Sequence, residues 1–388
     1  MSPRPGGWRE GDPAADRRFA DLGAIDLELG GHLPGVTLAY ETWGTLDADA
    51  SNAVLVLHAL TGDAHVHGVA GPGQPTAGWW DGLIGPGRPL DTERVFVVAA
   101  NVLGGCQGST GPSSRATDGR GYGRPYGSRF PRVTVGDQVR SERLLSDHLG
   151  VRRWAAVLGG SMGGMRALEW AYAYPDRVGA ALVVAVGAAA TGDQIGTQST
   201  QIAAIRADPG WAGGDYYDEA GGGPWAGMEI ARRIAHLTYR SEYELQDRFA
   251  GTPQAGEDPL AAVGPGRFAV QSYLDHQAVK LSRRFDPGTY VALTDAMNTW
   301  DLGRGRGGLE AALGRIEVPL LVGGVNTDRL YPLWQQEQIA TAPGTVKGLR
   351  VISSPSGHDG FLIERDQIFA LTAEAVGIGL GGSSSIEK

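Results

Sequence analysis

The sequence predicts an α/β fold with a mostly parallel central sheet and an inserted helical lid. Short apolar runs typical of strands alternate with helical stretches from about residue 52 to residue 186, the pattern of a parallel sheet with helices on both faces. The alternation stops over 189–300, where only helical periodicity is found, and resumes with strand-like runs at 318–323 and 348–353. A Gly-x-Ser-x-Gly turn joins one of the strands to its helix.

Composition limits the class of protein. The chain has 388 residues, of which 42% are hydrophobic and 20% are charged, as in ordinary globular proteins with a large core. Its net charge of −9 argues against non-specific nucleic-acid binding, which needs a basic surface. The single cysteine, Cys106, excludes an internal disulfide and a cysteine-cluster metal site. No secretory signal or membrane-length apolar run is found, so we expect a cytoplasmic protein.

The N-terminal part contains the first strands. Residues 1–20 are rich in Pro, Gly, Arg and Asp, so we expect a flexible arm. Two β-rich runs, 24–29 and 36–43, are expected to pair antiparallel at the start of the sheet. Apolar runs at 52–57 and 95–99 are expected to be buried strands.

The next elements surround the Gly-x-Ser-x-Gly turn. Thr134 is expected to cap a helix that ends near Leu149. A strand at 154–158, a helix at 162–174 and a strand at 178–186 follow. These elements belong to the alternating pattern of the sheet.

The domain boundaries follow from where the alternation stops and resumes. We assign 21–188 and 301–380 to the core and 189–300 to an inserted helical lid, and expect a disordered tail at 381–388. The helices expected in the lid are 198–207, 227–237, 260–281 and 289–297. A last helix is expected at 365–377.

The turn Gly159-x-Ser161-x-Gly163 has the pattern of a nucleophile elbow, the feature of the α/β-hydrolase fold that presents a reactive serine. A strand that turns sharply into a helix places the serine in a strained conformation and leaves no room for side chains two residues away. The helix N-terminus adds free N–H groups at the same point. The alternative is a plain strand-to-helix turn, which a glycine-rich chain also produces.

A serine nucleophile needs a base and an orienting carboxylate, which in α/β-hydrolases follow in the order Ser, Asp or Glu, His. His358 follows the last predicted strand, and Asp328 follows the strand before it, so these are the expected base and acid. Asp301 and Asp359 are rival acids, but Asp301 precedes the strand that should carry the acid, and Asp359 is adjacent to the histidine.

The other candidate reactive side chains have simpler interpretations. His65 and His67 resemble a ligand pair, but no third ligand lies near them in the sequence, so no metal site is expected. His58 ends a strand and is a candidate pocket residue. Cys106 is the alternative nucleophile, although a small buried thiol is the commoner role. Structural or surface roles are expected for His32, His148, His236 and His276.

An oxyanion hole is expected from two backbone N–H groups. One belongs to the residue after the nucleophile, Met162, and the other to the loop that follows an early strand. Within that loop, Leu60 is the expected donor.

Six motifs together resemble the homoserine O-acetyltransferase family over about residues 20–375. They are HALTGD (58–63), NVLGGCQGSTGP (101–112), GGSMGGMRALEW (159–170), ARRIAHLTYRS (231–241), DRLYP (328–332) and GHDGF (357–361). The resemblance implies an α/β-hydrolase whose helical lid also forms a homodimer. It further implies acyl transfer to L-homoserine in methionine biosynthesis, with acetyl-CoA as co-substrate and no bound cofactor.

The resemblance also implies roles for individual residues. It assigns Ser161, Asp328 and His358 as nucleophile, acid and base. The arginine that binds the substrate carboxylate falls on Arg232, with a one-residue ambiguity toward Arg233. Asp359 corresponds to the carboxylate that takes the substrate amino group, and Tyr239 is placed near the same site. Two positions depart from the family pattern: Thr327, where serine is frequent, and Trp300, where histidine is expected.

Two other function classes remain open from the residues alone. An esterase or lipase would use the same three side chains with water as acceptor, and a catalytically inactive scaffold would keep only the fold. The residues also leave acetyl and succinyl donors open, because very few pocket side chains would separate them.

Overall fold

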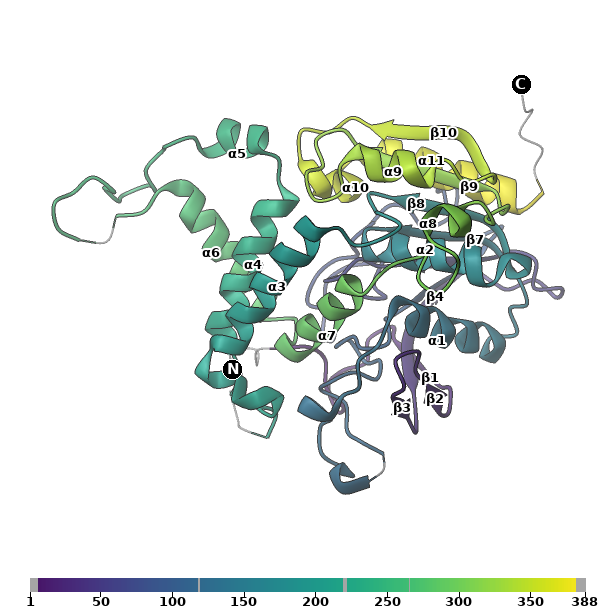
Figure 1. Cartoon of the computed structure of the whole chain (residues 1–388), viewed down its shortest axis with the longest axis horizontal. Coiled ribbons are helices and arrows are strands. Elements are labelled where there is room, and N and C mark those ends of the chain that lie inside the picture. Colours follow the sequence, from purple (N-terminus) through teal and green to yellow (C-terminus); the bar gives the residue numbers. More distant parts are fainter. Residues whose placement is uncertain (1–5, 118, 219–221, 265, 382–388) are drawn as a thin grey trace.

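The computed structural model describes residues 6–117, 119–218, 222–264 and 266–381. An eight-stranded sheet, in the order β1-β4-β6-β5-β7-β8-β9-β10, forms its centre (Figure 1). From β6 to β10 each neighbouring pair is parallel, whereas β4 pairs antiparallel with both β1 and β6. The strands are β1 (Arg18–Asp21), β4 (Thr37–Trp43), β5 (Ala53–Leu57), β6 (Phe96–Ala100), β7 (Trp154–Gly160), β8 (Val178–Val184), β9 (Leu320–Val325) and β10 (Thr345–Ile352). The expected mostly parallel sheet is confirmed.

The first strand pairing differs from the expectation. β2 (Ile25–Asp26) pairs with β3 (His32–Leu33) in a separate two-stranded sheet, and β4 takes β1 as its antiparallel neighbour instead. Gly30, with φ +89°, closes the small hairpin, and the Leu27 N–H donates to the Gly31 carbonyl at 2.8 Å. The predicted pairing of 24–29 with 36–43 is therefore wrong. A local turn lets the backbone of the first run form its hydrogen bonds with residues 31–33 instead of with the main sheet.

The N-terminal segment packs on the core from residue 6 onward, which corrects the expectation of a loose arm for residues 6–20. Arg17 is buried, and its guanidinium donates to the side-chain oxygens of Gln74 and Gln107, both at 3.0 Å. The Trp8 ring lies 5.3 Å from that of Phe19. The composition of this segment indicated a loop but did not reveal these long-range contacts. Residues 1–5 lie outside the part of the chain that the structure describes.

Helices cover both faces of the sheet, and β5 shows how its side chains divide between them. Leu55 and Leu57 share a buried cluster with residues of α1 (Val135–His148) and α2 (Met162–Ala173). Val54 and Val56 instead share a cluster with α11 (Arg365–Gly379). The division follows from the two-residue period of a strand.

The predicted cap of α1 is confirmed. The Thr134 hydroxyl accepts from the Asp137 N–H at 3.1 Å, and the Asp137 carboxylate accepts from the Thr134 N–H at 3.0 Å. This reciprocal pair is a capping box, which satisfies two N–H groups at the start of the helix.

The lid lies between β8 and β9 and projects from the core on the left of Figure 1. Its helices are α3 (Gly192–Ala207), α4 (Trp225–Tyr239), α5 (Glu242–Phe249), α6 (Ala269–Ser282) and α7 (Pro287–Asn298). α6 begins nine residues later than expected, after Gly264 at φ +117° and Gly266. α5 was not predicted, although Ser241 caps it by accepting from the Glu244 N–H at 3.0 Å.

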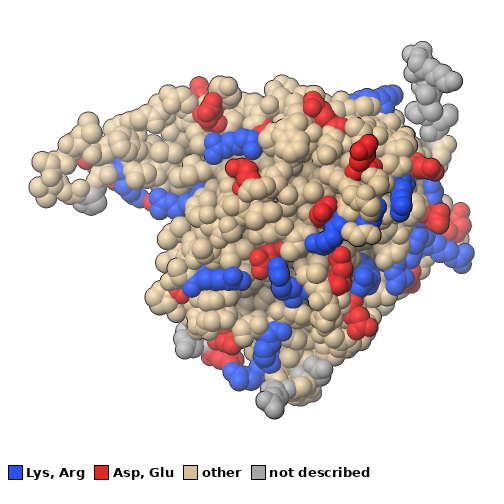
Figure 2. Space-filling model, in the orientation of Figure 1, with Lys and Arg blue, Asp and Glu red and all other residues tan. Residues whose placement is uncertain are grey.

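Short helices complete the chain. They are α8 (Leu309–Leu313), α9 (Leu333–Ile339), α10 (Gly360–Ile363), η1 (Gly119–Gly121), η2 (Gly127–Arg129), η3 (Pro175–Arg177), η4 (Pro209–Gly214) and η5 (Gly357–Asp359). On the face shown in Figure 2, basic and acidic side chains are interspersed rather than gathered by sign. None of the helices in the described part is both long and apolar enough to cross a membrane. Apart from Gly381, the expected disordered tail lies outside the described residues.

Candidate active site

Ser161 occupies the predicted elbow between β7 and α2. Its backbone has φ +56° and ψ −126°, a conformation that residues other than glycine rarely adopt. A Cβ atom on Gly159 would lie 2.1 Å from the Gly163 carbonyl oxygen, and one on Gly163 would lie 2.1 Å from the Leu57 carbonyl oxygen. Both glycines are therefore required by backbone crowding, as the motif predicted.

The structure brings Ser161, His358 and Asp328 into one hydrogen-bonded series. His358 Nε2 lies 2.9 Å from Ser161 Oγ, and His358 Nδ1 lies 2.6 Å from Asp328 Oδ2. The other Asp328 oxygen accepts from the N–H groups of Leu330 and Tyr331, each at 2.8 Å. The carboxylate is thus held by two fixed donors, and it is Asp328, not Asp301 or Asp359, that contacts His358 Nδ1.

The electrostatics of His358 suit a base. Burial lowers the pKa of His358, but the charge of Asp328, the hydrogen bond to it and the charge of Asp359 outweigh that effect and leave the pKa raised. The imidazole therefore takes up a proton more readily than an isolated histidine does. Because its Nδ1 faces a carboxylate, Nε2 is the nitrogen left to exchange a proton with Ser161.

The loop that follows β5 lies against the same site. Leu60 lines the cavity, and Met162 is the first residue of α2, where N–H groups have no intrahelical partner. Within the described residues, neither the Leu60 nor the Met162 N–H donates a hydrogen bond. One unpaired donor thus lies in the loop after β5 and the other at the N-terminus of α2, directly after the serine.

His58 supports this loop and is not among the residues that line the cavity, so the expectation of a pocket residue is wrong. Its Nδ1 lies 2.7 Å from the Ala59 carbonyl oxygen, and its Nε2 lies 3.1 Å from the Val102 N–H. Burial, followed by the charge of Arg166, lowers the pKa of His58 to about 3. The ring is therefore neutral, donating from Nδ1 and accepting at Nε2.

A cavity of ≈ 190 Å³ lies above the serine, between the core and the lid. Ser161, His358, Arg232, Tyr239 and Asp359, all predicted site residues, line it. The other lining residues are Ala59, Leu60, Thr61, Gly62, Trp79, Thr197, Gln198, Gln201, Thr238, Arg284, Met297, Leu330, Phe361 and Leu362. One space thus holds the hydroxyl, the imidazole and charges of both signs.

Arg232 and Arg233 are adjacent in α4 but have different surroundings. Arg232 lines the cavity, its guanidinium carbon lies 5.3 Å from the centre of the Tyr239 ring, and its buried Nε and Nη1 have no hydrogen-bond partner among the described residues. Arg233 is 39% exposed and pairs with Asp275 at 3.1 Å. Arg232, rather than Arg233, therefore faces the cavity that Ser161 and His358 line.

The sequence analysis assigned no role to two arginines that the structure places beside the predicted residues. Arg240 Nη2 lies 3.1 Å from Asp359 Oδ2. Arg284 lines the cavity and donates to the Thr61 carbonyl at 2.8 Å. Arg240 lies inside the motif ARRIAHLTYRS, so the sequence contained a signal for its place near the site. No sequence motif marked Arg284, because its contact with Thr61 depends on how the lid packs on the core.

The alternative reactive groups are engaged elsewhere. Burial, followed by the charge of Asp286, raises the pKa of Cys106 to about 12, which does not suit a nucleophile at neutral pH. His65 pairs with the buried Glu41 at 3.0 Å, whereas His67 pairs with Asp81 at 2.7 Å. The two histidines therefore have separate carboxylate partners rather than one shared ligand position.

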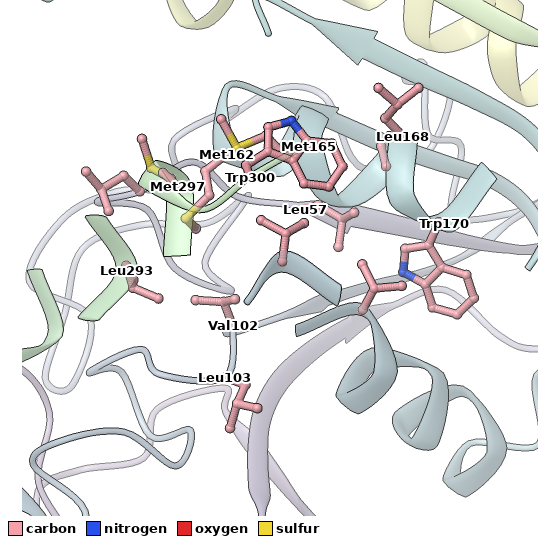
Figure 3. Packing of buried hydrophobic residues seen from close by; sticks show 14 of the residues in the cluster. Leu57, Val102, Leu103, Met162, Met165, Leu168, Trp170, Leu293, Met297 and Trp300 are labelled. Atoms are coloured by element: carbon pink, nitrogen blue, oxygen red, sulfur yellow. The ribbon is translucent and has the colours of Figure 1, made fainter. Parts of the chain in front are cut away.

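The two departures from the family pattern have local structural roles. The Thr327 hydroxyl donates to the Ser354 carbonyl at 2.6 Å and accepts from the Gly357 N–H at 3.0 Å, so it joins the loops that carry Asp328 and His358. Trp300 donates to the Gly187 carbonyl at 2.8 Å. Figure 3 shows Trp300 in the buried cluster that also contains Met162 and the cavity-lining Met297.

Comparisons with known proteins agree with this geometry. A family model described as the alpha/beta hydrolase fold matches residues 52–364. A homoserine O-acetyltransferase from Thermobifida fusca (strain YX) is 61% identical over 96% of this chain and 97% of its own. One from Mycolicibacterium smegmatis is 59% identical over 89% of both chains.

Two solved structures have the same architecture. Esterase E22 has a TM-score of 0.82 at 23% identity, covering 93% of this chain and 99% of its own, which shows the fold. Homoserine O-acetyltransferase from Bacillus anthracis has a TM-score of 0.80 at 25% identity, covering 93% of this chain and 97% of its own. Together with the matches in sequence, these findings show that the chain belongs to the homoserine O-acetyltransferase family of the α/β-hydrolase fold.

Proposed function

We propose that the protein transfers an acetyl group from acetyl-CoA to the hydroxyl of L-homoserine, giving O-acetyl-L-homoserine for methionine biosynthesis in the cytoplasm. The observation that carries the proposal is that Arg232 and Asp359 line the same ≈ 190 Å³ cavity as Ser161 and His358. A zwitterionic amino acid needs a cation for its carboxylate and an anion for its ammonium group, next to the reacting hydroxyl. The names of the relatives at 61% and 59% identity support the acceptor and the acetyl group.

In the first half-reaction Ser161 is the nucleophile. His358 Nε2, 2.9 Å from Ser161 Oγ, accepts the hydroxyl proton as the oxygen attacks the thioester carbon. The tetrahedral intermediate then collapses, the carbon–sulfur bond breaks, and the departing sulfur takes the proton from His358. CoA leaves as the free thiol, and the acetyl group remains as an ester on Ser161.

Asp328 and two backbone donors stabilise the charges that develop in this step. The Asp328 carboxylate, 2.6 Å from Nδ1, orients the imidazole and stabilises its protonated form. The N–H groups of Leu60 and Met162 hold the oxyanion. This role is supported by the place of Leu60 in the cavity that Ser161 lines, by the position of Met162 directly after Ser161, and by the lack of other hydrogen-bond partners for both N–H groups among the described residues.

In the second half-reaction the amino acid replaces CoA. His358 accepts the proton of its hydroxyl, the oxygen attacks the acetyl carbon, and the bond to Ser161 breaks with return of the proton to Oγ. Arg232 binds the carboxylate, which the two unpaired nitrogens of its guanidinium support, and Asp359 binds the ammonium group. The Tyr239 ring beside Arg232 shapes the same end of the cavity.

The lid also forms a homodimer contact in this proposal. Three side chains on α4 and α5 support it: Ile230 is 50% exposed, Leu237 is 38% exposed and Tyr243 is 68% exposed. Exposed apolar side chains on neighbouring helices are typical of an interaction surface. A second copy of the chain would remove them from water.

The test is the release of free thiol from acetyl-CoA with and without L-homoserine, together with detection of the acetylated product. The proposal requires thiol release that depends on homoserine and an equal yield of O-acetyl-L-homoserine. An esterase would release thiol at the same rate without homoserine, because water would accept the acetyl group. That result would replace the transferase proposal by hydrolysis.

A further inference from the structure

The lid segment 239–241 lies directly against the loop that carries His358. The Ser241 hydroxyl donates to the Pro355 carbonyl. At Gly357, which has φ +65°, a Cβ atom would lie 2.7 Å from both the Tyr239 carbonyl oxygen and the Ser241 N atom. Two separate contacts therefore fix this part of the lid relative to the catalytic loop.

Arg240, in the middle of this segment, bridges two carboxylates. Its Nη2 lies 3.1 Å from Asp359 Oδ2, and its Nη1 lies 3.0 Å and 3.1 Å from the two oxygens of Glu244. The three side chains are 11–16% exposed, so solvent screens these interactions only partly. Because Glu244 holds one side of the guanidinium, Arg240 presents a fixed donor to Asp359.

The bridge has a consequence for the charge of Asp359. Burial raises the pKa of Asp359, and Arg240 is the strongest of the groups that oppose this rise. The ion pair uses Oδ2, and Oδ1 has no hydrogen-bond or ion-pair partner among the described residues. The pKa of Asp359 stays above its usual range, but the cation fixed at Oδ2 favours the ionised form and orients the carboxylate, with Oδ1 available.

We propose that Arg240 is a positioning residue for the acceptor: it holds Asp359 so that Oδ1 faces the ammonium group of the bound amino acid. The inference rests on the proposed function and adds the residue that makes Asp359 selective for an amino group. Arg240 itself does not touch the substrate. Its loss should therefore weaken recognition of the amino group and leave the chemistry at Ser161 unchanged.

The experiment compares two acceptors, L-homoserine and 4-hydroxybutyrate, which has the same hydroxyl and carboxylate but no amino group. Arg240→Gln should lower acceptor kcat/KM for homoserine by about tenfold or more, and that for 4-hydroxybutyrate by less than about threefold. Single-turnover acylation by acetyl-CoA should stay near wild type. Arg240→Lys keeps the charge but not the bridge to both carboxylates. Its kcat/KM for homoserine should lie between the values for the wild type and Arg240→Gln.

Arg248→Gln is the matched control. Arg248 also pairs with Glu244, at 2.8 Å, but forms no ion pair with Asp359 in the part of the chain that the structure describes. Arg248→Gln should leave the ratio of kcat/KM for homoserine to that for 4-hydroxybutyrate unchanged. Equal losses for both acceptors in Arg240→Gln and Arg240→Lys, or the same change of ratio in Arg248→Gln, would overturn the inference. A wild-type protein without homoserine-dependent thiol release would instead contradict the proposed function.

Discussion

His358 Nε2 lies 2.9 Å from Ser161 Oγ, although the two residues are 197 positions apart in the chain. The ends of two parallel strands of the same sheet make this contact possible. Ser161 follows β7 and His358 follows β10, and the parallel strands between them carry both loops to one edge of the sheet. Asp328, after β9, reaches the far side of the imidazole from the same edge.

Replacing Ser161 by alanine should abolish acyl transfer and leave the fold intact. The hydroxyl is the proposed covalent site, so thiol release should fall by roughly 10³-fold or more. Alanine has the same backbone requirements as serine at φ +56°, so the midpoint of thermal unfolding should change little. A variant that is fully folded and still active would show that the covalent step is wrong.

Acetyl-CoA supplied without acceptor should leave an acetylated enzyme. Mass spectrometry should find one acetyl group on the peptide that contains Ser161, and initial rates should give parallel lines in double-reciprocal plots. Ser161→Ala is the control and should remain unmodified. Intersecting lines with an unmodified wild-type peptide would indicate direct transfer in a ternary complex.

Arg232→Ala should damage the homoserine half-reaction and spare acylation. Loss of a charged partner of a carboxylate in a desolvated site costs roughly 2–5 kcal/mol, so acceptor kcat/KM should fall by about tenfold to several thousandfold. Single-turnover acylation measures the first step separately. Arg233→Ala, which removes a residue paired with Asp275 at the surface, is the neighbouring control and should have little effect. If Arg233→Ala lost the homoserine half-reaction and Arg232→Ala did not, Arg233 would be the residue that binds the substrate carboxylate.

The pH dependence should reflect the raised pKa of His358. The neutral imidazole accepts the serine proton, so donor kcat/KM should decline as pH falls through a pKa above the usual value of about 6.5. Asp328→Asn removes the main charge that raises this pKa. Its residual activity should therefore decline at a lower pH than that of the wild type. An acid limb at the same pH in both proteins would assign it to another group.

The protein should sediment as a dimer at micromolar concentration. Ile230→Glu places a charge on the exposed apolar surface of α4 and should favour the monomer. Trp334→Glu is the control, because Trp334 is similarly exposed, at 54%, but lies on α9 of the core. A wild-type monomer would remove the dimer proposal without affecting the acyl-transfer proposal.

Much of the core and of the hydrogen-bonded series of Ser161, His358 and Asp328 could be predicted from the sequence because the signals are local. Ser161 needs Gly159 and Gly163 for steric reasons that act within a few residues. The positions of Asp328 and His358 follow from strand order, since parallel strands present their following loops at one edge. The cap at Thr134 is likewise contained in four residues.

Only the tertiary structure decided the features that depend on contacts between distant segments. Adjacent helical residues differ by about 100° in direction, so the packing of α4 determines that Arg232 and not Arg233 reaches the cavity. The ion pair of Arg240 with Asp359 exists because the lid lies on the loop that carries His358. Arg17 anchors the N-terminal segment through partners at positions 74 and 107, and no local pattern encodes partners so far along the chain.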